Sequence, residues 1–437
     1  MTAAGRPAFG MDPELQRKLG FTLLTLVIYR LGAHIFAPGV NVQAVTDFIK
    51  NSAAAGFFGL YDTLGGGLSR ATVFALGIMP YISASIIFQL AGGIVPSVGK
   101  MQKDEDGKKR LEQWTRYLTV FIAFSQAYTF AIFTESIPGA IPVPTFWTRL
   151  SMVVILTTGA VFVMWLGEQI TERGIGNGMS LLITFSILDR LWPGLVQMTG
   201  FWQQGALSFG RIVLFGAILL AVVAAVTGMS LAARRIPVQI PRKVMGRGRM
   251  TQGQKTFIPI RLITAGVMPI IFAQTIIIVP GTLASFTQNN VLRALADFFS
   301  PGEWPYDLTF AILILLFSYF YTSIIFNSVD LAENLKKQGG FIPGVKPGAS
   351  TADYIDNVLA RVTLPGAIFL ALVALVPVTL TRNMGFQQQF GGTSVLIVVG
   401  VLLDTIAQIQ QHLTLRKYDS FMKSGRIKFR GRQQRFM

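Results

Sequence analysis

The stretch ALGIMPYISASIIFQL, from Ala75 to Leu90, decides the fold of this 437-residue chain, because a related stretch occurs a second time. The second copy is TAGVMPIIFAQTIIIV, from Thr264 to Val279. An offset of 189 residues aligns Gly77 with Gly266, Met79 with Met268, Pro80 with Pro269, Ile82 with Ile271, Ala84 with Ala273 and Ile87 with Ile276. Proline inside a helix costs about 3 kcal/mol, so a shared proline is a stronger sign of duplication than shared apolar residues.

A second pair of related segments supports the first. GMSLLI and GTSVLI align Gly178, Ser180, Leu182 and Ile183 with Gly392, Ser394, Leu396 and Ile397. These segments follow the first pair in the same order within the two halves of the chain. The sequence therefore predicts an internal duplication.

The composition is that of a membrane protein. Hydrophobic residues make up 51% of the chain and charged residues 14%, and the mean hydropathy is +0.52. A soluble domain carries about 25% charged residues. Cysteine is absent and the two histidines, His34 and His412, lie far apart in the sequence. These facts exclude disulfides, thiolate chemistry and any usual zinc site, so we expect no cofactor. The first 20 residues are too long and too mixed in charge for a cleaved signal, and we expect the first span to be retained.

Ten segments are apolar enough to cross a membrane, at about 20 residues per crossing. They lie near residues 20–37, 73–94, 117–136, 150–169, 180–200, 209–232, 262–283, 308–327, 362–381 and 394–413. Ten crossings place both termini on one side. That side holds 30 of the 38 Lys and Arg residues in its loops and tails, and the positive-inside rule makes it cytoplasmic.

Each half of the chain holds five crossings, so the two copies must insert in opposite orientations, as an inverted repeat. We expect an N-terminal half at 1–200 and a C-terminal half at 201–437. The second half includes two cytoplasmic loops, 233–261 and 328–361, and a basic tail, 414–437. In such folds, helices broken by Gly or Pro at matched positions mark the transport path. Here they are the helices that contain Pro80 and Pro269.

No enzyme chemistry is visible. Walker A and HExxH motifs are absent, and the spans hold no paired carboxylates suited to an intramembrane protease. Only Arg30 and Asp404 are expected well inside spans, where an ion-coupled transporter normally carries several ionisable residues. Asp404 suits a structural hydrogen bond better than a proton relay. Any energy for transport must therefore come from a partner.

The duplicated positions carry aliphatic side chains at Ile78, Ile82, Ile183, Ile271 and Ile397. A ring of such side chains resists hydration and blocks ions. The simpler interpretation is helix packing. The span limits place Ile183 near the cytoplasmic start of its helix and Ile397 near the external start of its own. A ring therefore requires helices that begin deep in the membrane, with a water-filled funnel on each side.

The inverted repeat should place the second and seventh helices together and antiparallel. This arrangement pairs Ser83 with Ala273 and places Ala84 near Phe272. Small residues there allow close contact without a strong lock.

Two further segments stand out. A half-apolar run, residues 53–64, ends in three glycines and is interpreted either as a hinged segment or as a helix lying on the outer membrane surface. The segment 234–261 carries eight basic residues and no acid. Its charges suit docking to a partner, although orientation of the chain in the membrane explains many of the same residues.

Several long motifs resemble the SecY family, the pore subunits of the bacterial Sec protein translocase. They are GGGLSRATVFALGIMPYISASIIFQL, MWLGEQITERGIGNGMSLL, TAGVMPIIFA, NLKKQGGFIPGVKPG and FGGTSVLIVV. The resemblance covers nearly the whole chain in order. It implies an all-α, polytopic channel of ten helices in two inverted halves. Such a channel passes unfolded secretory polypeptides across the bacterial cytoplasmic membrane and releases apolar segments into lipid, with no enzymatic activity of its own.

The resemblance also assigns roles to residues. It adds Met179 to the pore ring, at a position usually held by isoleucine. It implies a side gate between the second and seventh helices, which we expect at Ser83, Ala84, Gln89, Phe272, Ala273 and Val279. It implies a plug at 56–70, with Phe57, Phe58, Leu60, Leu64, Gly65, Leu68 and Arg70. The docking set is Arg242, Lys243, Arg247, Arg249, Lys346 and Arg361, of which Lys346 replaces the family's usual arginine. The implied partners are SecE, SecG, the SecA motor, the ribosome through its RNA, the unfolded preprotein with its signal peptide, and the lipid bilayer. The competing functions are a secondary transporter with the same repeat and a membrane scaffold.

Overall fold

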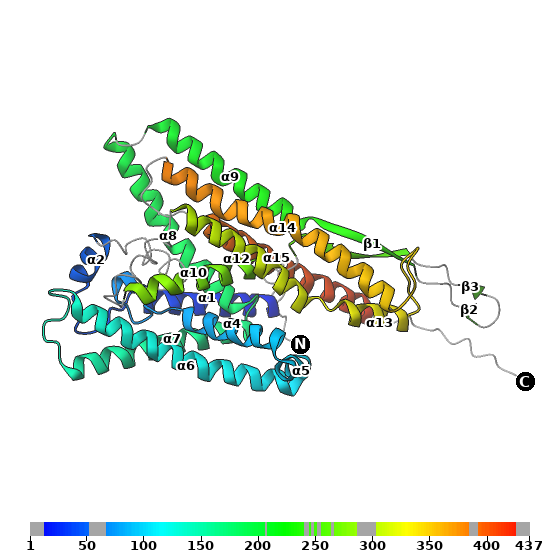
Figure 1. Ribbon diagram of the computed structural model, residues 1–437, viewed down its shortest axis with the longest axis horizontal. Coiled ribbons are helices and arrows are strands. Elements are labelled where there is room, and N and C mark those ends of the chain that lie inside the picture. Colours follow the sequence, from blue (N-terminus) through cyan, green and yellow to red (C-terminus); the bar gives the residue numbers. More distant parts are fainter. Residues whose placement is uncertain are drawn as a thin grey trace, which may run out of the picture.

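A computed structural model describes residues 13–51, 67–205, 208–239, 244–245, 249–250, 255–263, 266–285, 303–383 and 392–424. Each of the ten predicted spans corresponds to one long helix (Figure 1). These helices are α1 (Pro13–Gly32), α4 (Met79–Ile94), α6 (Glu105–Ser136), α7 (Phe146–Arg173), α8 (Gly178–Gln203), α9 (Phe209–Leu231), α10 (Met268–Ser285), α12 (Trp304–Ile325), α14 (Ala349–Asn383) and α15 (Gly392–Ser424). Because α8 continues to Gln203, the expected division at residue 200 falls inside a helix, and the break between halves lies before α9.

Shorter elements cap the two ends of this bundle. At one end lie α5 (Pro96–Lys103), α13 (Ser328–Lys337) and the strands, and at the other lies α2 (Val42–Asn51) (Figure 1). Among the described residues, six helices are long and apolar enough to cross a membrane, and α4 with α5 makes a seventh if that bent pair is one span. The helix at the predicted first span, α1, is not among them. It starts at Pro13 and includes four charged residues, and these lower its hydropathy.

The segment expected to be a basic loop, 233–261, is a β-hairpin. Strand β1 (Ala233–Gln239) pairs antiparallel with β4 (Lys255–Arg261), and two short strands, β2 (Val244–Met245) and β3 (Arg249–Met250), pair beyond them. Ile236 and Val238 alternate with exposed residues along β1. They pack against Ile355 and Leu359 of α14 in a second hydrophobic cluster. The hairpin is therefore fixed to the helical bundle by its apolar face.

Ion pairs within the bundle correct the expectation that only Arg30 and Asp404 lie inside spans. Arg30 of α1 forms an ion pair with Asp189 of α8. Arg116 and Glu168 join α6 to α7 with an N–O distance of 2.8 Å. Paired charges of this kind hold helices together and differ from the unpaired acids of a proton relay.

The two prolines that mark the repeat are also placed differently from the expectation. Pro80 is the second residue of α4, and Pro269 is the second residue of α10. The first turn of a helix tolerates proline because its N–H has no intrahelical partner there. The glycines three residues before them, Gly77 and Gly266, have φ angles of 52° and 61°. The prolines and glycines thus start these helices instead of interrupting them, and the second half repeats the geometry of the first.

The segments that lead into α4 and α10 each run along a long neighbouring helix, α7 or α14. Gly159 of α7 faces the carbonyl oxygen of Val73, so closely that a Cβ atom would overlap it, and Gly366 of α14 faces the carbonyl of Leu262 in the same way. Val73 and Leu262 are themselves 189 residues apart. Gly159 and Gly366 lie at the midpoints of their helices. The backbone therefore reaches the middle of the bundle before α4 or α10 begins.

Substitution of these glycines tests the close approach. We expect Gly159→Ala and Gly366→Ala each to destabilise the protein by roughly 1–3 kcal/mol, because the added methyl group meets a backbone carbonyl. The measurement is the thermal unfolding midpoint of the purified protein in detergent. Gly216→Ala on α9 is the matched control, since nothing lies within 4 Å of its Cβ position. Equal midpoints for all three variants would contradict the packing described.

Candidate functional site

Four helices begin inside the bundle instead of at its surface. Besides α4 and α10, these are α8 and α15. Gly178, the first residue of α8, packs against the carbonyl of Gly167 in α7, six residues before α7 ends. At 1.5 Å of rise per residue, α8 begins about 9 Å inside that end. Gly392, the first residue of α15, packs in the same way against Val373 of α14, about 15 Å from the end of that helix.

The predicted aliphatic ring is carried by the first two turns of these four helices. Ile82 and Ile271 are the fourth residues of α4 and α10, and Ile183 and Ile397 are the sixth residues of α8 and α15. All four side chains are at most 6% exposed and belong to one continuous hydrophobic cluster. Ile78, the residue before α4, is 2% exposed in the same cluster. The deep helix starts remove the geometric objection to a ring.

Met179 has a different environment from the isoleucines. It is partly buried, and its sulfur lies over Gly167 of α7, where a Cβ would overlap it. Met179 and Ile183 are four residues apart and so share a face of α8. Its side chain therefore fills the contact between α7 and α8 at the edge of the ring positions.

The predicted side opening lies between helices that are in contact, since α4 packs against α10. Ala84 and Ala273 are fully buried, and Ser83 is partly buried. The ring of Phe272 makes edge-on contacts with Phe317 and Tyr321 of α12, so it anchors α10 to α12.

Each of these two helices carries one glutamine. Gln89 donates a hydrogen bond to Ser85 of its own helix at 2.9 Å. The buried Gln274 has no hydrogen-bond partner for its Oε1 atom. The side chain of Val279 lies outside the described residues.

Most of the expected plug, including Phe57, Phe58, Leu60, Leu64 and Gly65, lies outside the described residues. Its end forms a 3₁₀ turn, Leu68–Arg70, in which Leu68 is buried and Arg70 is exposed. This turn contacts α2, a helix that the sequence interpretation missed. Val42, Val45 and Ile49 recur at helical spacing and could have revealed it. The turn and α2 together close the hydrophobic cluster at this end of the bundle.

Those of the expected docking residues that the structure describes lie at the opposite end. Lys346 and Arg361 are exposed, before and within α14. Arg242, Lys243 and Arg247 lie outside the described residues, and Arg249 is placed only as a backbone position in β3. The bridge between Gln239 and Phe341 joins the hairpin to the segment after α13. Hairpin, α13 and the start of α14 thus form one surface.

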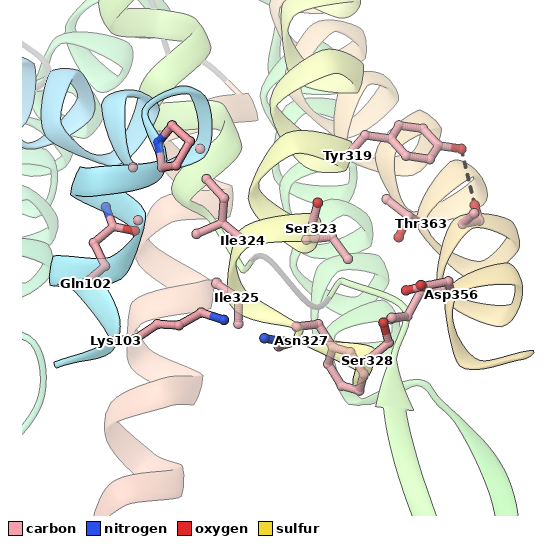
Figure 2. A pocket seen from close by; sticks show the side chains of 18 of the residues that line it. Gln102, Lys103, Tyr319, Ser323, Ile324, Ile325, Asn327, Ser328, Asp356 and Thr363 are labelled. Carbon is pink, nitrogen blue, oxygen red and sulfur yellow. Dashed lines mark hydrogen bonds between the residues drawn. The ribbon is translucent and has the colours of Figure 1, made fainter. Parts of the chain in front are cut away.

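A cavity of about 1100 Å³ lies at this end, between α4 and α5 on one side and α12 and α14 on the other. Figure 2 shows Tyr319 and Thr363 on one wall and Gln102 and Lys103 on the other. The Tyr319 hydroxyl donates to the carbonyl of Ala360 at 3.2 Å. The lining combines apolar side chains with the basic residues Lys100, Lys103 and Lys108, and the parts of the chain described hold no group of three metal-ligating residues. This geometry suits an opening between two halves better than a catalytic centre.

Comparison with known sequences identifies the family. The family model SecY matches residues 72–406. Three curated relatives are named protein translocase subunit SecY. The one from Aquifex aeolicus is 41% identical over 94% of this chain and 97% of its own. The Streptomyces griseus protein is 42% identical over 94% and 98%, and the Escherichia coli protein is 39% identical over 96% of each chain.

Solved structures share the fold. One described as "The structure of a protein conducting channel" superposes with a TM-score of 0.66 at 18% identity, covering 98% of both chains. Sec61 in a canine ribosome-channel complex gives 0.63 at 18% identity, again over 98% of both. The predicted ten-helix membrane fold is confirmed. With its duplicated helix starts and a match of about 40% identity along almost its whole length, the chain belongs to the SecY family.

Proposed function

We propose that this protein is a protein-conducting channel that passes unfolded polypeptides across the bacterial cytoplasmic membrane and releases apolar segments sideways into lipid. The observation that carries the proposal is the set of four helices that start inside the bundle and carry a buried isoleucine in their first two turns. Two of these starts come from each half. A constriction built this way divides two funnels and has no chemical function of its own.

The proposed pore ring consists of Ile78, Ile82, Met179, Ile183, Ile271 and Ile397. Aliphatic side chains offer no ligands to an ion, so a narrow ring of them excludes hydrated ions by dewetting. The same side chains form no specific contacts with a passing polypeptide. Translocation through such a ring is passive, and its direction must be imposed by a partner that pushes or holds the chain.

The proposed plug, residues 56–70, enters from the face where α2 lies. Its described end, Leu68, is anchored in the hydrophobic cluster. Gly65, Gly66 and Gly67 come directly before Leu68 in the sequence. Three glycines in a row offer the hinge that the rest of the segment needs to leave the pore mouth.

The proposed partners are SecE and SecG in the membrane, and SecA or the ribosome at the surface formed by the hairpin, α13 and α14. Two relatives in fold are described as ribosome-bound, the canine Sec61 complex and an idle yeast Ssh1 complex on the 80S ribosome. A basic surface suits ribosomal RNA, because Lys and Arg bind phosphate. The same charge supports a cytoplasmic position for this surface and both termini.

The contact between α4 and α10 is called the seam below. Protein transport by a channel whose seam can be locked shut tests the function directly. Reconstituted with SecE and SecG in liposomes, and supplied with SecA and ATP, the protein should carry an unfolded preprotein into a protease-protected lumen. Cysteines at Ser83 and Ala273 should form a disulfide that blocks this transport, and reduction should restore it. Each single cysteine variant is the control for oxidation. A disulfide that forms and leaves transport unchanged would exclude this seam, and an ion-coupled solute flux without protein transport would overturn the function.

The ring is tested by ion leakage. Ile82→Ser with Ile271→Ser should raise the chloride or potassium permeability of proteoliposomes about tenfold or more, because hydroxyl groups hydrate the constriction. The control is Ile86→Ser with Ile277→Ser, two buried positions on the same helices beyond the first turn. Equal leakage from both double variants would show that the ring residues only pack the helices and do not form a seal.

The docking surface is tested by charge reversal. Arg247→Glu with Arg249→Glu should weaken SecA or ribosome binding about fivefold or more at moderate salt, and the difference should shrink as salt is raised. Arg234→Glu with Arg235→Glu makes the same charge change at the base of the hairpin and serves as the control. If the two variants bind alike, net charge and not the hairpin tip governs docking.

A further inference from the structure

The two halves do not pack tightly where the seam meets the docking surface. The cavity of about 1100 Å³ separates them there. Its first wall comes from the ends of α4 and α5 and includes Gly92, Lys100 and Lys103. Its second wall comes from α12, α13 and α14 and includes Asn327 and Asp356. The first wall is basic, and the second carries an acid.

The first wall is rigid because α5 folds back on α4. The two helices meet at an angle of 108°. The side chain of Gln102 donates a hydrogen bond to the carbonyl of Phe88 at 3.2 Å. A Cβ at Gly99 would lie only 2.8 Å from the carbonyl oxygen of Gly92, so this contact admits no larger residue. Lys103, the last residue of α5, is therefore carried by the gate helix α4.

Asp330 lies in the first turn of α13, two residues after Ser328 of the second wall. The side-chain amide of Asn327 donates to Oδ2 of Asp330 at 2.5 Å, and the backbone N–H of Asp330 donates to Oδ1 of Asn327 at 3.2 Å. This reciprocal capping fixes the carboxylate at the helix start. Leu331 and Leu335 of α13 pack against the cluster that contains Ile236 of the hairpin. A displacement of the docking surface would therefore move Asp330.

One ion pair crosses the gap between these walls. Nζ of Lys103 lies 3.9 Å from Oδ2 of Asp330, with 69% and 62% of the two side chains exposed. Figure 2 shows Lys103 reaching from α5 toward Asn327 at the start of α13. The pair thus links the gate helix of one half to the docking surface of the other.

We propose that Lys103 and Asp330 form a latch that favours the closed arrangement of the cytoplasmic end of the seam. The inference rests on the proposed function, since a latch has a role only if the seam opens. Exposed ion pairs are weak, and this one should change the ratio of open to closed seams by about two- to fivefold. A weak latch suits a seam that a docking partner must open, because movement of α13 alone is enough to break it.

The test measures the width of the seam in the reconstituted channel. Cysteines at Gln113 of α6 and Asn357 of α14, both exposed, carry spin labels in a chain that has no other cysteine. Pulsed electron resonance gives the distribution of distances between the labels. Lys103→Glu and Asp330→Lys should each raise the ratio of wide to narrow distances about two- to fivefold. The double variant K103E/D330K reverses the pair and should restore the original ratio.

The control variant is Lys337→Glu, which makes the same charge change as Lys103→Glu but disrupts a pair with Glu333 within α13. It should leave the distances unchanged. At about 1 M salt all variants should give the same distribution, because the screening length falls to about 3 Å. A double variant as wide as the single ones, or single variants as narrow as the parent, would overturn the latch. Preprotein transport by the unmutated channel tests the proposed function separately, so the two failures are distinguishable.

Discussion

Backbone N–H and C=O groups inside a membrane protein must find partners within the protein, because lipid offers none and each unsatisfied group costs several kcal/mol. This requirement is hardest to meet for helices that begin in the middle of a bundle, because their first N–H groups have no intrahelical partners. In the segment that leads into α8, and at the first residue of α8, the N–H groups bind side chains from three other helices. Thr22 of α1 accepts from the N–H of Ile175 at 3.2 Å, and Gln408 of α15 accepts from the N–H of Gly176 at 3.0 Å. Thr171 of α7 accepts from the N–H of Gly178 at 2.9 Å.

The same requirement explains the approach to α4. Residues 71–73 pair with the chain that leaves α1, through a 2.8 Å bond from the N–H of Ala37 to the carbonyl of Ala71 and another from Val73 to Ile35. The chain then turns through Gly77 and enters the helix. Irregular backbone is thus tolerated at the centre of the bundle only because α1 and α7 enclose it. Glycine is needed wherever that enclosure brings one backbone directly against another.

The sequence was sufficient to predict the ten helices, because apolar runs of about 20 residues and the distribution of Lys and Arg are strong signals. It also located the repeat, and hence the four isoleucines. The residues at which the helices begin were harder to predict from the sequence. Pro80 was interpreted as a break within a helix, whereas it starts one, because hydropathy continues across the non-helical segment before it. The elements at the bundle ends, α2, α5, α13 and the hairpin, were missed for a related reason: they are short and fixed by tertiary contacts, such as Ile236 against Leu359. The ion pair between Arg30 and Asp189 was missed because Asp189 falls in an apolar run and no local pattern links residues 159 positions apart.

The duplication gives the constriction a property that a single half does not have. Each half supplies one interior helix start that follows a long entering segment, α4 or α10, and one that follows a short return from a long helix, α8 or α15. If the halves insert in opposite orientations, each pair of equivalent starts comes from opposite faces. The apolar cluster that contains the four isoleucines spans both halves, so a seal made by them requires that the halves stay together. In the proposed channel the halves separate along the contact between α4 and α10, so the movement that opens the proposed path to lipid also widens the proposed ring. Sideways release of a segment then loosens the seal, which is the need that the proposed plug would answer.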